Sequence, residues 1–265
     1  MLALLALPFH PRPKASFQPQ PQIDPRTIVD HSVQANRADW AASPKYEFDE
    51  TDYDSSGHTR TYEVTMILGS PYDRLIRING EPISRAQQAA EERKYLQAVR
   101  LRRNETAAQR ARRVGAYERG RARDHLLMNQ LAIAFTFKLI GEQQLGPYKV
   151  YVLQATQRPG YNPPNRDAQV LTGMAGTLWI DERTFQWVKV EAHVVQPVAI
   201  EGFLARVEPG TEFELEKMPV GNGIWLKKHF SMHSRAKILY FFQRNAQEEE
   251  NFSNYRLQEP LQDSR

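Results

Sequence analysis

The part of the sequence that most constrains the fold is its C-terminal third, Val170–Tyr255, where strand-forming segments alternate with short turns. The segments 176–181 and 185–191 are rich in β-branched and aromatic residues and flank the polar turn Asp181–Thr184, a pattern typical of a β-hairpin. Such short connections leave no room for crossover helices, so they predict an antiparallel meander. Further strands are expected at 201–207, 211–217, 224–233, 236–244 and 252–257.

Two interruptions of this meander are expected near its end. Ser234–Arg235 is interpreted as the turn that joins the segments 224–233 and 236–244. The polar run Gln247–Glu250 breaks the alternation of apolar and polar residues, and we therefore expect it to separate the last short strand from the rest.

Apolar residues occupy both faces of several expected strands. Strict alternation places Phe185 and Trp187 on the face opposite Val188 and Val190, and the segment 236–244 is also apolar on both faces. Such a sheet has to be covered on both sides or curve around a groove. Two architectures therefore stay open: an ordinary β-sandwich core, and a strongly curved sheet whose concave apolar face is partly closed by helices.

The N-terminal half predicts both helices and strands. Asp24 and Pro25 suit the start of a helix that ends before Pro44, and Ser84–Gln87 has the form of a capping box. Helices are expected at 25–42, 86–103 and 106–131, and strands at 46–54, 60–68, 73–78, 135–140 and 148–156. We expect a single domain, 25–258, that contains a helical insertion at 84–131, with a disordered tail at 259–265.

Residues 1–24 begin with the apolar run Met1–Leu7 and continue as a proline-rich stretch. The run has the composition of the end of a secretory signal peptide, although no basic residue precedes it. We therefore expect an exported, periplasmic protein with a truncated signal peptide and an extended linker. The alternative is a disordered apolar N-terminus.

Positive charge is concentrated in one segment. Between Arg85 and Arg123 there are twelve basic and four acidic residues, a local charge of +8, whereas the whole chain carries +4. Such a surface can bind anionic membranes or nucleic acid, but few aromatic residues accompany it, which disfavours nucleic acid. A solvated helical hairpin is the third interpretation. The residues proposed for an anionic surface are Arg100, Arg102, Arg103, Arg110, Arg112 and Arg113.

The sequence offers no catalytic or metal-binding signature. There is no cysteine, no phosphate-binding glycine loop and no nucleophile elbow. His229 and His233 share one strand face but stand roughly 13 Å apart at strand rise, too far to share a metal. Glu212, Glu214 and Glu216 alternate along one face, which is typical of a solvated sheet surface. We expect no enzyme activity, no cofactor and no metal.

The order of elements and three motifs resemble the LolA/LppX-like superfamily of lipoprotein carriers, which includes outer-membrane lipoprotein-sorting proteins. The motifs are the hairpin with Gly176–Asp181 and Trp187–Val190, the segment Gly221–Trp225, and Phe252–Tyr255. The resemblance extends over about 26–257. It implies an α+β fold, an unclosed antiparallel barrel with lid helices, that binds an acyl chain or lipoprotein in the periplasm. The arginine-rich insertion departs from the compact carriers.

We therefore expect a non-enzymatic, monomeric carrier for a lipid or a lipidated protein. Binding would be driven by burial of acyl methylenes, at about 0.8 kcal/mol each. An anionic membrane surface is a second expected partner, and the alternative functions are nucleic-acid binding and a structural role in the envelope. The side chains expected to line the apolar face are Trp179, Trp187, Phe230, Met232, Tyr240 and Phe242.

Overall fold

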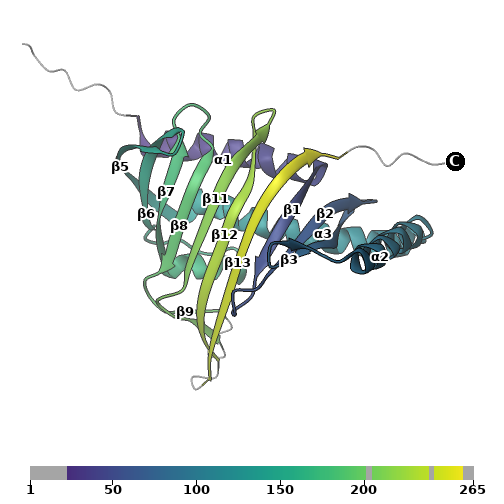
Figure 1. Cartoon of the computed structure of the whole chain (residues 1–265). Helices are drawn as coiled ribbons and strands as arrows, with labels where there is room; N and C mark the ends of the chain where they lie inside the picture. The colour runs from purple at the N-terminus through teal and green to yellow at the C-terminus, as the bar shows by residue number, and fades with distance from the viewer. Residues whose placement is uncertain (1–22, 201–204, 239–241, 259–265) are drawn as a thin grey trace, which may run out of the picture.

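The computed structural model describes residues 23–200, 205–238 and 242–258. One thirteen-stranded antiparallel sheet organises them (Figure 1). Its strands follow the order β4-β3-β2-β1-β13-β12-β11-β8-β7-β6-β5, and the short strands β9 and β10 lie off this path beside β12. Because β4 and β5 are not paired with each other, the sheet is an unclosed barrel.

The strands follow the expected meander. In chain order they are β1 Tyr46–Tyr53, β2 Thr59–Ile67, β3 Ser70–Ile78, β4 Glu81–Pro82, β5 Phe135–Leu145, β6 Tyr148–Gln157, β7 Met174–Asp181, β8 Trp187–Val194, β9 Val198–Ala199, β10 Ala205–Val207, β11 Glu212–Gly221, β12 Ile224–Ile238 and β13 Phe242–Leu257.

Local signals define the helices. The helical elements are α1 Pro25–Ala42, η1 Ser43–Lys45, α2 Arg85–Arg103, α3 Ala107–Ala134 and η2 Asp167–Gly173. The Asp24 carboxylate accepts a hydrogen bond from the Arg26 amide and caps α1. Ser84 and Thr106 each open a helix with a complete capping box, which satisfies amide groups that have no partner within the first helical turn.

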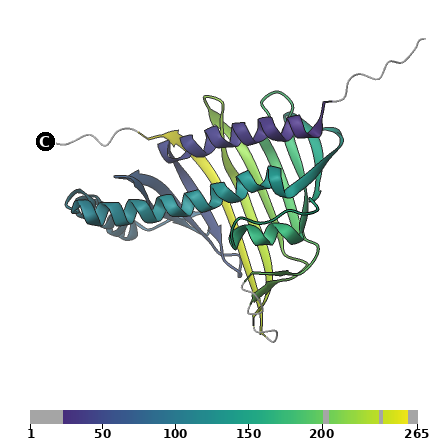
Figure 2. The ribbon, with the colours of Figure 1, turned by 180° about the vertical axis from the view of Figure 1, so that it is seen from behind.

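Helices α1 and α3 lie on one side of the sheet, whereas α2 lies beyond its β3 edge (Figures 1 and 2). Figure 2 shows α1, α3 and η2 crossing this side, which we call the inner face. Between the helices and the sheet lies the main core, where Ile28 and Val29 of α1 meet Leu153, Ile180 and Val190 of the strands. The opposite side is the outer face, where Val150, Val152, Val188 and Trp225 form a second, smaller apolar cluster.

The structure confirms the α+β class, the curved unclosed sheet and the lid helices. Both interruptions expected near the end of the meander are wrong. Strand β12 runs unbroken through Ser234–Arg235, and the Thr211 hydroxyl accepts a hydrogen bond from the Arg235 amide. Strand β13 runs unbroken through Gln247–Glu250, since an unclosed sheet tolerates charged side chains on exposed stretches of either face. The expected signal remnant at 1–22, the tail at 259–265 and much of the strand 201–207 lie outside the described residues.

Candidate functional site: the inner face of the sheet

A buried charge network fixes α1 to the sheet. Lys217 of β11 is 7% exposed and Asp39 of α1 is 3% exposed. The Lys217 ammonium donates to the Asp39 carboxylate and to Asn36 Oδ1, the latter at 2.8 Å. Asp39 also accepts from Gln186 Nε2 at 3.1 Å and from the Trp225 amide at 2.9 Å. Burial lowers the pKa of Lys217, and the adjacent Asp39 carboxylate opposes that shift.

Trp40 of α1 is the centre of a group of contacts that hold helix α3 against α1. The Trp40 ring stacks on His125 at a centroid distance of 4.3 Å, and the Arg121 guanidinium lies 4.4 Å from the centre of the same ring. Trp40 Nε1 donates to the Arg121 carbonyl at 3.3 Å, and Arg121 donates back to the Trp40 carbonyl. Burial lowers the pKa of His125, with Arg37 and Arg121 adding to the shift, so the stacked ring favours its neutral form.

Phe230 and Met232 are half-buried apolar side chains on the inner face of β12. The strand register aligns Phe230 with Leu215 of β11, and Leu215 with Val190 in the main core. Within the described residues, neither Phe230 nor Met232 belongs to the apolar side chains packed against that core. These two apolar side chains are therefore partly exposed and lie outside the sealed core.

The other side chains expected to line one apolar face do not gather with Phe230 and Met232. Trp187 is 3% exposed, and its Nε1 donates to the Ser32 hydroxyl of α1 at 3.2 Å, so it is sealed in the core. Trp179 is aligned with Lys189 and lies on the outer face beside the smaller cluster. Tyr240 and the side chain of Phe242 lie outside the described part of the chain.

Carboxylates flank Phe230 and Met232 along the inner face. Glu250 and Glu248 of β13 lie opposite them in register. Glu50, Asp52 and Glu250 bring their carboxylate oxygens within 4.8 Å of one another. Burial raises the pKa of Glu50 to about 7, and repulsion from Glu250 adds to the shift. The Lys227 ammonium, 3.6 Å from Glu250, partly offsets this repulsion.

The raised pKa of Glu50 predicts a pH-dependent stability. The folded state holds the Glu50 proton up to about pH 7, whereas an unfolded chain loses it near 4.5, so the free energy of unfolding falls as pH rises between these values. Glu50→Gln is expected to stabilise the protein by about 1–2 kcal/mol at pH 8, after allowance for partial exposure, and to change little at pH 4. Urea unfolding at both pH values tests this, with the exposed Glu81→Gln as the control. Equal stability of Glu50→Gln and wild type at pH 8 would contradict the shift.

The arginine-rich insertion forms a helical hairpin of α2 and the first half of α3. Arg102 donates to the carbonyls of Ile67, Ser70 and Pro71 at 2.8–3.0 Å. Arg113 donates to Ser70 Oγ at 2.7 Å and pairs with Glu105. These two arginines therefore clamp the hairpin onto the β2–β3 turn. The four others from the expected anionic-surface set are exposed around the hairpin tip, namely Arg100, Arg103, Arg110 and Arg112.

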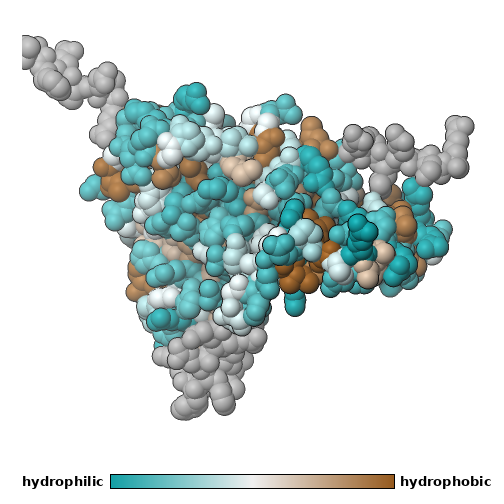
Figure 3. All heavy atoms as spheres, viewed as in Figure 1, coloured by the Kyte–Doolittle hydropathy of each residue, from teal (hydrophilic) through white to brown (hydrophobic). Residues whose placement is uncertain are grey.

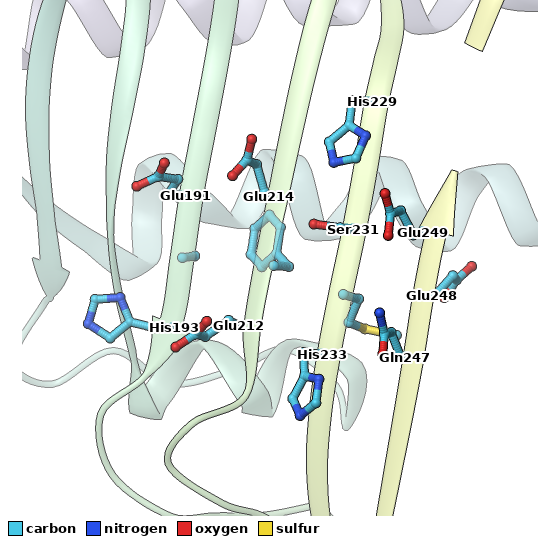
Figure 4. A pocket seen from close by; sticks show the side chains of 13 residues that line it. Glu191, His193, Glu212, Glu214, His229, Ser231, His233, Gln247, Glu248 and Glu249 are labelled. Carbon is cyan, nitrogen blue, oxygen red and sulfur yellow. The ribbon is translucent and has the colours of Figure 1, made fainter. Parts of the chain in front are cut away.

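A polar hollow of about 580 Å³ lies over β8, β11, β12 and β13. Side chains of the outer face form most of its lining, and Phe213, Met232 and Glu248 from the other face also contribute. Figure 4 shows its labelled side chains, which are glutamates and histidines together with Ser231 and Gln247, from all four strands. Figure 3 shows that this side of the molecule is mainly hydrophilic, with hydrophobic patches interspersed. The sequence identified His229 and His233 on this face but gave no indication that His193 and Glu212 would join them.

No family model and no curated protein matches this sequence. The chain is similar to a solved structure described as an outer membrane lipoprotein-sorting protein domain from Vibrio parahaemolyticus, with 9% identity, 89% of this chain and 95% of that chain covered, and a TM-score of 0.34. A LolA superfamily protein from Nitrosomonas europaea is similar over 90% of this chain and 96% of its own, with 11% identity and a TM-score of 0.31. A DUF1329 family protein from Desulfovibrio piger has the same identity and TM-score, with 91% and 97% covered.

The superfamily that the sequence resembles is thus named among these structures. Since the TM-scores are low, we base the fold class on the strand order and register alone. Among the described residues, no helix is both long and apolar enough to cross a membrane.

Proposed function

We propose that this protein is a non-enzymatic periplasmic carrier that binds a lipid or a lipidated protein on the inner face of its sheet. The supporting observation is the pair Phe230 and Met232, which is apolar and half-buried but outside the sealed core. An acyl chain laid over this pair would bury methylenes at about 0.8 kcal/mol each. Binding and release of such a ligand require no chemical step.

The lid helices suit this proposal because the C-terminal end of α1 is attached both to the sheet and to α3. The charge network of Lys217 and Asp39 joins α1 to β11, while Trp40 joins it to α3. A ligand entering beside Phe230 would therefore meet a fixed sheet and a fixed lid, which lowers the entropy lost on binding.

Native mass spectrometry of the protein purified under mild conditions tests the proposal. We expect a co-purifying species of stoichiometric mass, and lipid extraction should then identify its acyl chains. A clean apo mass that stays unchanged after incubation with phospholipid vesicles would overturn the carrier function.

A second function, contact with an anionic membrane surface, is favoured by the four exposed arginines at the hairpin tip. Each cation near such a surface contributes about 1 kcal/mol, so replacing Arg100, Arg103, Arg110 and Arg112 together with glutamine should weaken vesicle binding by about tenfold or more. Co-sedimentation with phosphatidylglycerol vesicles measures this. Arg85→Gln, at the other end of α2, is the control. Unchanged binding by the fourfold variant would exclude the tip as the contact.

A further inference from the structure

The strand register brings two histidines and a glutamate onto one line across the outer face. Glu212 of β11 lies directly opposite His193 of β8 on one side and His233 of β12 on the other. Side chains directly opposite in an antiparallel pair have Cβ atoms about 5 Å apart. The two histidine positions therefore flank that of Glu212 on the neighbouring strands, and Figure 4 shows all three side chains at the same end of the hollow.

These three side chains differ from their neighbours in having no partner among the described residues. Lys189 pairs with Glu191 at 2.8 Å and with Glu214 at 2.9 Å. Lys228 pairs with Glu216, and His229 shares a hydrogen bond with Asn251. The side chains of His193, Glu212 and His233 take part in no such contact within the described ranges, and all three are exposed.

We propose that His193, Glu212 and His233 bind a divalent transition-metal ion such as Zn²⁺. Imidazole nitrogens and a carboxylate oxygen are ligands that this ion prefers, and three protein ligands leave a fourth position open. The donor atoms do not converge in the structure, so binding requires rotation of exposed side chains between staggered rotamers. The paired strands hold the backbone positions fixed during that rotation.

The surroundings of the three ligands fit this assignment. Glu191 and Glu214 form the neighbouring cross-strand pair in the same hollow. Glu191 is two residues before His193 on β8, and Glu214 is two residues after Glu212 on β11. Both carboxylates pair with Lys189, and the three groups together leave a net negative charge beside the proposed ligands, which favours a cation. All three residues line the 580 Å³ hollow, which leaves room for a water molecule or a side chain of a partner beside a bound ion. The three proposed ligands are not among the residues proposed to contact the lipid, although Met232 also lines this hollow.

Isothermal titration of the tag-free full-length protein with Zn²⁺ tests the site. We expect one ion per chain with micromolar affinity, weakened by about tenfold or more in His193→Ala, in His233→Ala and in Glu212→Gln. His229→Ala is the matched control, since this histidine lines the same hollow but already bonds Asn251. It should bind Zn²⁺ as tightly as wild type does.

Three results would overturn the proposal. They are an absence of binding by the wild-type protein, equal affinity in wild type and His193→Ala, and a loss in His229→Ala as large as in His193→Ala. Circular dichroism of each variant verifies folding. If an alanine variant unfolds, the nearly isosteric Glu212→Gln gives the decisive titration.

Discussion

Replacing Asp39 with alanine is expected to lower the free energy of unfolding by about 3–5 kcal/mol, because the change leaves the Lys217 ammonium buried without its counter-ion. The same carboxylate accepts hydrogen bonds from Gln186 and from the Trp225 amide, so its removal also leaves two buried donors unsatisfied. Chemical denaturation followed by tryptophan fluorescence gives the free energy directly.

Matched variants distinguish the stability lost by breaking the buried ion pair from a general effect of substitutions in α1. Asp30→Ala alters an exposed carboxylate of the same helix and should change stability by less than about 0.5 kcal/mol. Lys217→Met alone should destabilise, since Asp39 then becomes the unpaired charge. The double variant Asp39→Leu with Lys217→Met should recover the part of the loss that comes from the unpaired charge, while Gln186 and the Trp225 amide still lack their acceptor. If Asp39→Ala lowers the free energy of unfolding by less than about 1 kcal/mol, the network does not hold the helix against the sheet.

Weaker attachment of α1 to the sheet is also expected to speed the release of a bound ligand. This helix covers the inner face together with α3 (Figure 2), and the Asp39 network is its polar attachment to β11. At temperatures where Asp39→Ala still folds, the variant should therefore release a bound lipid faster than Asp30→Ala does. Stability and ligand retention are then coupled through the same buried carboxylate.

Local sequence signals predicted most of the elements because each depends on near neighbours. The caps at Asp24 and Ser84 are formed within two or three residues of the side chain that makes them. The hairpin of β7 and β8 likewise follows from its own turn at Asp181–Thr184. The unclosed sheet was predicted from the family resemblance, because the alternation of apolar and polar residues alone was equally compatible with a β-sandwich.

The faces of several strands could not be predicted because bulges reset the alternation. Strict alternation put Trp187 opposite Val190, yet both belong to the main core. An irregularity in the pairing of β7 with β8, between Trp179 and Ile180, accounts for this, since one extra residue moves the following side chains to the other face.

Contacts between residues far apart in the sequence could not be predicted from local sequence signals either. Asp39 and Lys217 are separated by 178 positions, and nothing in either local segment indicates the other. The histidine pair that the sequence did identify, His229 and His233, lies along one strand. The closer arrangement of His193, Glu212 and His233 runs across three strands and depends on register, which only the assembled sheet provides.

Phe230→Lys is expected to reduce lipid retention by about tenfold or more, because it places a cation where the proposed acyl chain lies. The variant should fold, since the new ammonium lies opposite Glu250 in a group of crowded carboxylates. Retained lipid per chain, measured by native mass spectrometry after incubation with phospholipid vesicles, gives the result.

Ser231→Lys provides the matched control one residue along the same strand. Its side chain points to the outer face, where it lies opposite Glu214 and Glu249, so it receives the same charge in an equally acidic setting. If the inner face binds the lipid, only Phe230→Lys loses it, since the two variants differ in the face that they alter. Equal retention by both variants would place the lipid elsewhere, and a loss confined to Ser231→Lys would assign it to the outer hollow.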